Sequence, residues 1–472
     1  EKLGQSIGFK VRFNEQGSND SIVRLMTDGI LLAELSNDRF LNKYDTIIID
    51  EAHERSLNID FIMGYLKTIV KKRPDLKIII TSATLDVNRF SNYFNGAPIF
   101  EVEGRSFPVE VIYRPISEMT IGGSDDDDFD DFEENLPRAV VQAVEECFQD
   151  AESKGHPEHA DILIFASTEL EIRELQETLQ KFGPKHTQVL TLYARLALAE
   201  QQKIFNPSGG GRRIIIATNV AETALTVPNI RYVIDSGFAR ISRYNYRSRV
   251  QRLPIEAISQ AAANQRKGRC GRVAPGVCIR LYSEEDFTGR PEFTEPEILR
   301  TNLASVILQM ANLRLGSVDD FAFIEPPDSR LVTDGHKLLD ELGAITSKKA
   351  SQKETASNAK KQKGLDHLVL TPTGQKMARM PIDPRLARML VAGSDFDCIR
   401  EMLIVVAALA VQDPRERPAN KRQQADQKHA EFRQDDSDFL FYLSLWKALL
   451  ERTKTATNCL AISVRILPRK TI

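Results

Sequence analysis

Two adjacent carboxylates, Asp50 and Glu51, end the β-branched run TIIID at residues 46–50, within the segment IIIDEAHERS. The run predicts a strand buried on both faces of a parallel sheet, because its apolar residues are consecutive. Open α/β sheets bind ligands at the carboxyl ends of their strands. One carboxylate there could hold Mg²⁺ through its water shell, and the other could orient or deprotonate an attacking water. The alternative is that Asp50 only caps a helix and that His53 is a packed or capping imidazole.

A second apolar run, KIIITSAT at residues 77–84, follows a helix-like stretch from Leu57 to about Lys72. A strand, a helix and a strand at this spacing predict a βαβ unit with parallel strands. If the two strands are neighbours, the hydroxyls of Ser82 and Thr84 lie near the carboxylates. They could then relay the state of bound phosphates through hydrogen bonds.

The segment ANQRKGRCGRV at residues 263–273 carries Gln265, Arg269 and Arg272, spaced four and three apart. On a helix these three side chains would share one face. Arginine presents planar donors to phosphate oxygens, and one such residue from a second domain can act as an arginine finger. The alternative is a basic helix that contacts solvent or an RNA backbone. Gly268 and Gly271 favour the first interpretation, because a solvated helix would not contain them.

A third candidate cluster follows the apolar run RRIIIAT at residues 212–218, and then an arginine-rich stretch begins. Residues that come directly after this strand would lie at its carboxyl end. The later arginines alternate with tyrosines, which predicts a β-hairpin that contacts phosphates and stacks on bases; the alternative is a solvated hairpin. The strand-end residues are Thr218, Asn219, Glu222 and Thr223, and the hairpin residues are Arg240, Arg243, Tyr244, Tyr246, Arg247, Arg249 and Arg252.

Further apolar runs predict a second parallel sheet, at residues 161–167, 188–194, 212–218, 231–237 and 276–282. Two consecutive sheet domains suggest a ligand clamped between them. The acidic run at residues 124–134 predicts a solvated linker, with a mimic of nucleic acid as the alternative. From about Glu292 the pattern is mostly helical. The Lys-rich stretch 348–363 predicts a mobile surface loop.

Composition excludes few classes of protein. The 472 residues suffice for three or four domains, and 42% hydrophobic with 27% charged residues is ordinary for a globular chain. The net charge of −3 gives no global sign of nucleic acid, so local basic patches matter. Five scattered cysteines without metal-ligand spacing predict a reduced, cytoplasmic protein without zinc. The longest apolar run, at residues 402–411, is too short to span a membrane and predicts a buried helix.

The motifs MTDGILL, IIIDEAHERSLN, TSATLD, ATNVAETALT and NQRKGRCGR, in this order, resemble those of the DEAH-box RNA helicases of superfamily 2. The pieces PIDPRLARML and QDPRERP, with Lys267 and Cys270, resemble the bacterial HrpA-type branch. The resemblance covers residues 1–451. It implies an α/β fold of two tandem RecA-like parallel-sheet domains, followed by mostly α winged-helix and ratchet domains. The implied boundaries are 1–112 (partial first RecA-like domain), 113–136 (acidic linker), 137–288 (second RecA-like domain), 289–383 (winged helix with a Lys-rich insert at 347–364), 384–452 (partial ratchet) and 453–472 (unassigned tail).

The resemblance also implies roles for single residues, with ATP or another NTP and Mg²⁺ as cofactors and RNA as partner. Asp50 would hold the Mg²⁺ water shell, Glu51 would position the hydrolytic water, and His53 would link to Gln265. Arg269 and Arg272 would grip the γ-phosphate. The nucleotide-binding set would be Ser82, Thr84, Phe205 under the base, Glu222 and Thr223. The RNA-binding set would be Thr27, Asp28, Gly29, Thr218, Asn219, Arg240 and Arg243, mainly through backbone contacts. No protein partner is indicated.

One departure concerns the phosphate-binding loop G-x-x-x-x-G-K-[ST] of the family, since the sequence has no Gly-Lys dipeptide. We therefore expect a fragment that lacks the region of this loop and is inactive by itself. The rival hypothesis is a non-catalytic RNA-binding scaffold of helicase fold. A DNA helicase of the same fold is a third hypothesis.

Overall fold

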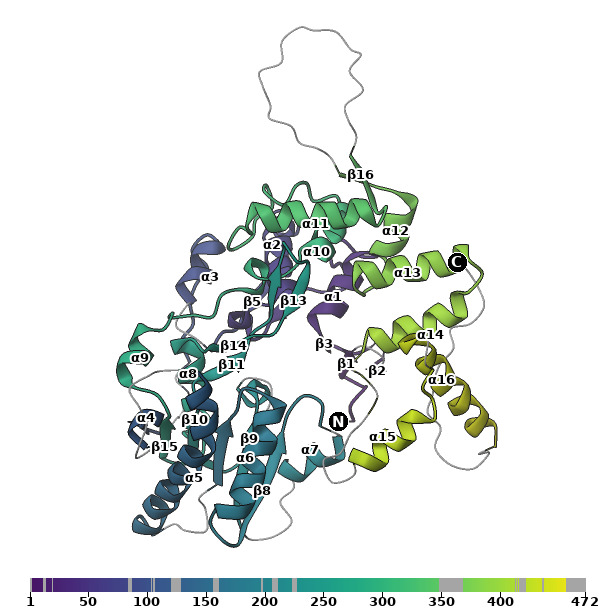
Figure 1. Ribbon diagram of the computed structural model, residues 1–472. Coiled ribbons are helices and arrows are strands. Elements are labelled where there is room, and N and C mark those ends of the chain that lie inside the picture. The colour runs from purple at the N-terminus through teal and green to yellow at the C-terminus, as the bar shows by residue number, and fades with distance from the viewer. Residues whose placement is uncertain are drawn as a thin grey trace, which may run out of the picture. The chain divides into compact units, whose positions relative to one another are not determined.

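The computed structural model divides into two compact parts, which we describe separately (Figure 1). The sheet unit comprises Lys43–Leu303 and Ala322–Leu331, and the helical unit comprises Glu1–Asn42, Ala304–Phe321 and Val332–Ile472. The structure describes residues 2–11, 14–18, 20–83, 87–102, 104, 107–119, 129–155, 161–196, 198–205, 211–222, 227–347, 368–411, 413, 415, 422–434 and 437–455.

A six-stranded parallel sheet forms the centre of the sheet unit. Its strand order is β6 (Val109–Tyr113), β15 (Gly276–Arg280), β10 (Ile230–Asp235), β7 (Asp161–Phe165), β9 (Arg212–Ala217) and β8 (Thr187–Leu192). All five predicted strands are present, and their neighbours run parallel. Strand β6 adds a sixth, pairing with β15 from Val109 opposite Gly276 to Tyr113 opposite Arg280. The boundary predicted after residue 112 therefore lies within strand β6, because the segment VEVIY forms the edge strand of the second sheet.

Both faces of this sheet are covered, as the consecutive apolar runs predict. One face packs on helices α5 (Phe129–Ser153) and α6 (Glu169–Phe182), where Ile164 and Ile216 join Leu175 in one apolar cluster. Figure 1 shows α5 and α6 beside these strands. The opposite face packs on α7 (Leu198–Phe205) through Ile204. Helix α5 begins inside the predicted linker, whose residues 120–128 lie outside the described part.

Two further parallel strands, β4 (Thr46–Ile49) and β5 (Lys77–Ile80), pair with Ile49 opposite Ile80. Helix α2 (Leu57–Ile69) joins them, and its N-cap Ser56 accepts a hydrogen bond from the Ile59 amide. The predicted βαβ unit is therefore confirmed. The prediction that strand β4 is buried on both faces is wrong, because Ile47 and Ile49 are buried but Ile48 is 61% exposed. The described residues cover only one face of this pair.

The remaining elements of the sheet unit are short. Strands β11 (Phe238–Arg240) and β14 (Ile255–Ala257) pair antiparallel, as do β12 (Arg243–Asn245) and β13 (Val250–Arg252). They form the β-hairpin that the arginine-rich stretch predicts. The helices are η1 (Ala52–Glu54), α3 (Val87–Tyr93), α4 (Ile116–Met119), η3 (Asn219–Ala221), α8 (Gln260–Lys267), α9 (Glu284–Gly289) and η4 (Glu297–Leu299).

The helical unit is mostly α, as predicted for the C-terminal part. It contains β1 (Ile7–Val11), β2 (Asn14–Gln16), β3 (Val23–Met26), α1 (Asp28–Leu35), α10 (Ala304–Leu313), most of α11 (Ser329–Glu341), the antiparallel pair β16 (Ile345–Ser347) and β17 (Leu368–Leu370), α12 (Pro372–Ala378), α13 (Pro384–Asp395), α14 (Ile399–Leu409), α15 (Arg422–Ala430) and α16 (Asp438–Thr455). Helix α14 contains most of the apolar run 402–411, but only part of it is buried, since Leu403 is 51% exposed. The Lys-rich stretch 348–363 and residues 456–472 of the predicted tail lie outside the described part.

Candidate active site

The DEAH segment leaves strand β4 through a tight loop. Glu51 and Arg55 both have positive φ, 52° and 48°, and they flank the short helix η1. Residues other than glycine adopt this left-handed conformation only where the surroundings enforce it. Here the Ala52 amide donates to the Thr81 carbonyl at 3.0 Å, and the Glu54 amide donates to the Glu51 carbonyl at 3.0 Å. The loop is thus tied to the end of the neighbouring strand β5.

Asp50 contacts a residue that the sequence analysis did not select. Its Oδ1 accepts hydrogen bonds from the Glu51 amide at 3.1 Å and from the hydroxyl of Thr81. Ser82 and Thr84 were the predicted neighbours, but Ser82 is half-buried next in sequence and Thr84 lies outside the described residues. The register explains the difference, because Ile49 faces Ile80 and the next residues on the two strands are Asp50 and Thr81.

His53 points its two ring nitrogens at different groups. Its Nδ1 accepts from the Ala83 amide at 3.2 Å, so the DEAH and SAT segments are joined directly. Its Nε2 lies 3.3 Å from Oε2 of Glu51, and its side chain is only 7% exposed. His53 and Gln265 line the same pocket, described below, which is compatible with the link proposed between them.

The arginine segment departs from the predicted geometry. Helix α8 ends at Lys267 with Gly268 as C-cap, so Arg269 and Arg272 follow the helix and do not share a helical face with Gln265. The turn packs against the start of β6: the Phe107 amide donates to the Gly271 carbonyl at 2.8 Å. A Cβ at Gly271 would lie 2.6 Å from Cγ2 of Val109. Close approach to β6, and not a helical face, therefore accounts for this glycine.

One pocket of about 480 Å³ nevertheless unites the two predicted clusters. This volume lies within the usual range for ligand pockets, about 300–1,000 Å³. Its walls come from the DEAH loop, the SAT segment, helix α8 with the arginine turn, and the loop before η4. The lining residues are Glu51, His53, Ala83, Gln260, Ala261, Asn264, Gln265, Gly268, Arg269, Arg272, Glu292 and Phe293.

The electrostatics of the arginine side favour an anion. Burial, together with the charge of Arg272, lowers the pKa of Arg269 to about 10, while Glu222 and Glu51 act in the opposite direction. The positive charges of Arg269 and Arg272 repel each other, and the oxygens of a phosphate bound to both guanidinium groups would compensate this repulsion. The carboxylate-bearing residue Glu51 lines the same pocket.

Several predicted nucleotide residues lie elsewhere. Glu222 is not among the lining residues of the pocket; its Oε2 accepts from Nε of Arg266 at 3.0 Å. Phe205, also absent from that lining, ends helix α7 with 36% of its surface exposed. Thr223 lies outside the described residues.

The predicted RNA residues fall into separate places. Thr27 is the N-cap residue of α1, and Asp28 accepts from the Gly29 amide at 2.6 Å, all in the helical unit. In the sheet unit, Thr218 precedes η3, which begins at Asn219.

The hairpin arginines differ in their partners. Arg243 donates to both carboxylate oxygens of Glu256, at 2.6 and 2.9 Å, and to Glu295. Its charge is therefore compensated within the protein. Arg240, the other hairpin arginine predicted to bind RNA, is exposed at the end of β11. Of the two, Arg240 is the better placed to contact a phosphate.

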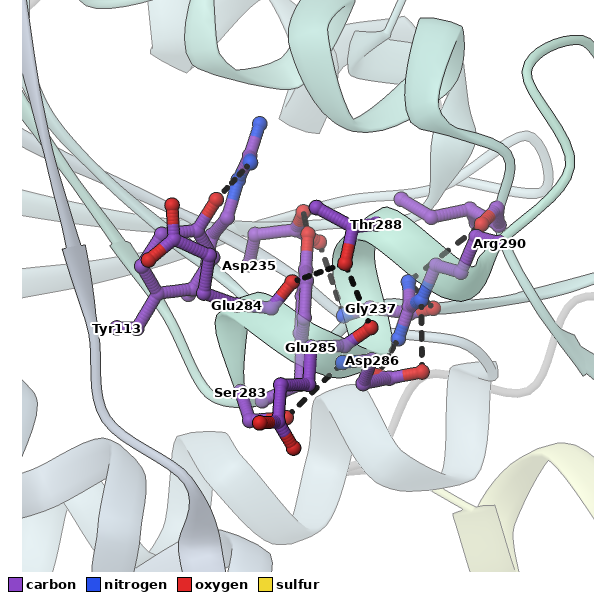
Figure 2. A network of polar contacts seen from close by, with 12 residues as sticks. Tyr113, Asp235, Gly237, Ser283, Glu284, Glu285, Asp286, Thr288 and Arg290 are labelled. Carbon is purple, nitrogen blue, oxygen red and sulfur yellow. Dashed lines mark hydrogen bonds and ion pairs between the residues drawn. The ribbon is translucent and has the colours of Figure 1, made fainter.

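A buried polar network around Asp235 also escaped the sequence analysis. Asp235 ends strand β10, is fully buried, and accepts from Nη1 of Arg266 at 2.7 Å. Figure 2 shows Asp235 near Gly237, whose carbonyl accepts from Arg290 at 2.9 Å. A charged residue inside the strand run RYVIDSG was the available signal, because a buried aspartate requires a partner.

Comparisons with known proteins show which families and relatives the chain resembles. Residues 141–274 match the helicase conserved C-terminal domain, and residues 383–442 match the ratchet-like helicase associated domain (HA2). The chain is 56% identical over 455 residues to the ATP-dependent RNA helicase HrpA of Escherichia coli (strain K12), covering 96% of this chain and 33% of that protein. It is 56% identical over 458 residues to the HrpA homologue of Haemophilus influenzae, covering 97% of this chain and again 33% of the relative. The chain thus spans about a third of the length of these relatives.

Solved structures give the same result for the fold. The crystal structure of the Escherichia coli DEAH/RHA helicase HrpB superimposes with a TM-score of 0.73 at 28% identity, over 96% of this chain and 52% of that one. A second structure, of the E. coli DExH-box NTPase HrpB, gives a TM-score of 0.72 at 28% identity, over 96% of this chain and 50% of that one.

The chain is similar to DEAH-box helicases and has a parallel-sheet core and a mostly helical C-terminal region, as they do. Both sequence relatives named above are of the HrpA type. Among the described residues, no helix has the length and apolar character needed to cross a membrane.

Proposed function

We propose that the protein containing this chain is an ATP-dependent RNA helicase, in which NTP hydrolysis drives translocation on RNA and unwinding. The observation that carries the proposal is the pocket that brings Glu51 and His53 together with Gln265, Arg269 and Arg272. The carboxylate of Glu51 and the two arginines, which line one pocket, match phosphoryl transfer to water, where catalysis is mainly positioning and stabilisation of charge.

The residues present fit the Mg²⁺ ion and the terminal phosphate of a nucleotide. The desolvated Arg269 and its neighbour Arg272 would hold the terminal phosphate, and their donors suit its oxygens. Asp50 would hold the water shell of Mg²⁺, with Thr81 fixing its carboxylate. ATP supplies the phosphoanhydride bond whose cleavage provides the free energy. Glu51 would orient and deprotonate the attacking water, with Nε2 of His53 3.3 Å from its carboxylate.

RNA would be bound mainly through its backbone, which gives sequence-independent and salt-sensitive affinity. The described residues that would contribute are Thr27, Asp28 and Gly29 of the helical unit and Thr218, Asn219 and Arg240 of the sheet unit. The hairpin β12–β13 would wedge strands apart. A cytoplasmic location is part of the same proposal and rests on the free thiols of Cys147, Cys270, Cys278 and Cys398.

The test is Glu51→Gln in the complete reading frame that contains this chain. ATP turnover should fall below detection while nucleotide binding persists, because the amide retains the size of the side chain and loses only the base. RNA-stimulated turnover that survives the substitution would exclude Glu51 from this role. An unsubstituted protein that binds RNA without any turnover would favour the scaffold hypothesis. Competition between RNA and DNA strands of matched sequence would separate an RNA from a DNA helicase.

A further inference from the structure

Both the side-chain carboxylate and the main-chain carbonyl of Glu222 accept hydrogen bonds from the arginine segment. Its carboxylate Oε2 accepts from Nε of Arg266 at 3.0 Å, and its main-chain carbonyl accepts from Nη2 of Arg269. Glu222 is also the C-cap residue of η3, the short helix that starts directly after Thr218. One residue thus connects the carboxyl end of strand β9 with an arginine that lines the pocket.

Arg266 is a rigid anchor for the Glu222 carboxylate. Its side chain is fully buried, Nη1 donates to Asp235 at 2.7 Å, and Nη2 donates to the Phe238 carbonyl at 3.2 Å. Its guanidinium also lies 4.7 Å from the centre of the Phe165 ring. Because these partners come from strands β7, β10 and β11, the carboxylate of Glu222 is held against the core of the sheet.

Asp235 is itself held from two sides. It accepts from the Tyr282 hydroxyl at 2.9 Å and from the Gly237 amide at 3.0 Å. Figure 2 shows Asp235 and Gly237 in one network with Arg290 and Asp286. Gly237 has a φ of +83°, and a Cβ there would lie 2.6 Å from Cδ1 of Tyr282. The anchor therefore has little freedom to shift.

The charges in this cluster are unequal. Asp235 and Glu222 place two carboxylates around the single guanidinium of Arg266. Burial raises the pKa of Glu222, and Arg266 and Arg269 counteract it. The Arg269 guanidinium, whose own charge is disfavoured by burial and by Arg272, is stabilised first by Glu222. The carboxylate of Glu222 thus stabilises the positive charge of Arg269 as well as that of Arg266.

We propose that Glu222 is a positioning residue for Arg269. Arg266 fixes the carboxylate of Glu222, and the main-chain carbonyl of Glu222 then determines the position of the Arg269 guanidinium in the pocket. This inference rests on the proposed function, because it assumes that Arg269 meets the terminal phosphate. It gives Glu222 a role outside the nucleotide contact that the sequence predicted. It also implies that a shift of the segment Thr218–Ala221 is transmitted to the phosphate side of the pocket.

The competing explanation is that Glu222 only compensates the buried charge of Arg266. Both explanations expect a loss of stability when the carboxylate is removed. Only the positioning role expects a selective loss at the terminal phosphate, and only that role depends on the side chain of Arg269. Binding measurements can therefore separate the two without relying on turnover.

The experiment uses the complete reading frame that contains this chain, with Glu222→Gln, Arg269→Ala and the double variant. Dissociation constants are measured for Mg²⁺–ADP and for Mg²⁺–ADP with aluminium fluoride, which occupies the place of the terminal phosphate. Glu222→Gln should weaken the aluminium fluoride complex about tenfold, as for one hydrogen bond to a charged group, and ADP less than about twofold. In the Arg269→Ala background it should have no further effect on the aluminium fluoride complex.

Asp286→Asn is the matched control, because it removes another carboxylate of the same network, paired with Arg290 at 2.6 Å and not with Arg269. It should leave both dissociation constants unchanged. Equal weakening of both ligands by Glu222→Gln, or an undiminished effect in the Arg269→Ala background, would overturn the proposal.

Two further outcomes have separate meanings. If Glu222→Gln does not fold, Glu222→Asp retains the charge and should show the same selective loss; its absence in that variant would also overturn the positioning role. If the unsubstituted protein neither hydrolyses ATP nor binds the aluminium fluoride complex, the proposed function itself fails. Selective binding in the unsubstituted protein with no selective loss in the variants contradicts only the role of Glu222.

Discussion

The guanidinium of Arg55 donates to both carboxylate oxygens of Asp60, from Nε at 2.5 Å and from Nη2 at 3.0 Å, and both side chains are buried. A third partner, Glu325, accepts from Nη1 of Arg55 at 3.2 Å. Because Arg55 closes the DEAH loop in a left-handed conformation, this ion pair holds the end of the loop opposite to Asp50.

Asp60→Asn should destabilise the sheet unit by about 3–5 kcal/mol, because it leaves a buried guanidinium without its main counter-charge. Urea unfolding of this chain, followed by circular dichroism, measures the change. Glu325→Gln is the control and should lower the free energy of unfolding less, since the Glu325 side chain is 26% exposed and water screens its charge. Equal losses for the two variants would contradict the assignment of Asp60 as the main partner.

Thr81→Val should impair hydrolysis in the complete reading frame, because it removes the hydroxyl that donates to Asp50 and leaves a similar volume. We expect a decrease in kcat of about tenfold, as for one hydrogen bond to a charged group. Thr81→Ser retains the donor and should stay close to the parent. If valine and serine behave alike, the hydroxyl of Thr81 does not orient Asp50.

Gly271→Ala should destabilise the arginine turn by about 1–3 kcal/mol through overpacking. The added Cβ would lie 2.6 Å from Cγ2 of Val109 and 2.8 Å from the Phe107 carbonyl. Gly289→Ala is the matched control, because a Cβ at Gly289 meets no atom within 4 Å among the described residues. Thermal unfolding that shifts equally in both variants would argue against close packing at Gly271.

Arg240→Ala and Arg243→Ala should separate RNA contact from stability in the hairpin. Arg240 is exposed, so its removal should weaken binding of a single-stranded RNA and reduce the salt dependence of log K by about one unit. Arg243 is paired with Glu256 and Glu295, so its removal should leave the salt dependence nearly unchanged. Fluorescence anisotropy at several KCl concentrations gives both values, and a larger slope change for Arg243 would reverse the assignment.

His336 should make the helical unit sensitive to acid. Burial lowers the pKa of His336, and Asp319 opposes the effect. With a folded-state pKa below the unfolded value of about 6.5, the unfolded chain binds the proton more tightly. The contribution of neutral His336 is therefore present above that value and is lost as the pH falls through it to the folded-state pKa. His336→Gln should flatten the pH dependence of the unfolding free energy over this interval, and an unchanged slope would rule the histidine out.

The strands were predictable from the sequence because consecutive apolar residues require burial on both sides. The apolar runs predicted all five strands of the second sheet and the pairing of β4 with β5. Ile48 is exposed against this expectation because burial depends on what covers a face, and a strand's own residues do not contain that information. Strand β6 was not predicted because a short edge strand has no local signal that assigns it to one sheet or the next.

The site was predictable as a meeting of two clusters, and less so in its contacts. Glu51 and Arg269 line one pocket as expected. Spacing alone placed Arg269 on a helical face, but the helix ends at Lys267, since packing on β6 overrides helical periodicity. Glu222 is polar and close in sequence to the strand end, yet its orientation depends on Arg266, which lies 44 residues away. Such long-range partners cannot be read from a single sequence.

The crowded contact between Gly271 and strand β6 also has an evolutionary consequence. Every amino-acid replacement of a glycine introduces at least a Cβ, and here the first carbon already meets Val109 and the Phe107 carbonyl. Any replacement of Gly271 is therefore expected to shift the start of strand β6, because one of the two contacted atoms belongs to the backbone. Natural variation at Gly271 is therefore expected to accompany a changed path of the chain at Phe107, which a replacement of Val109 alone does not provide.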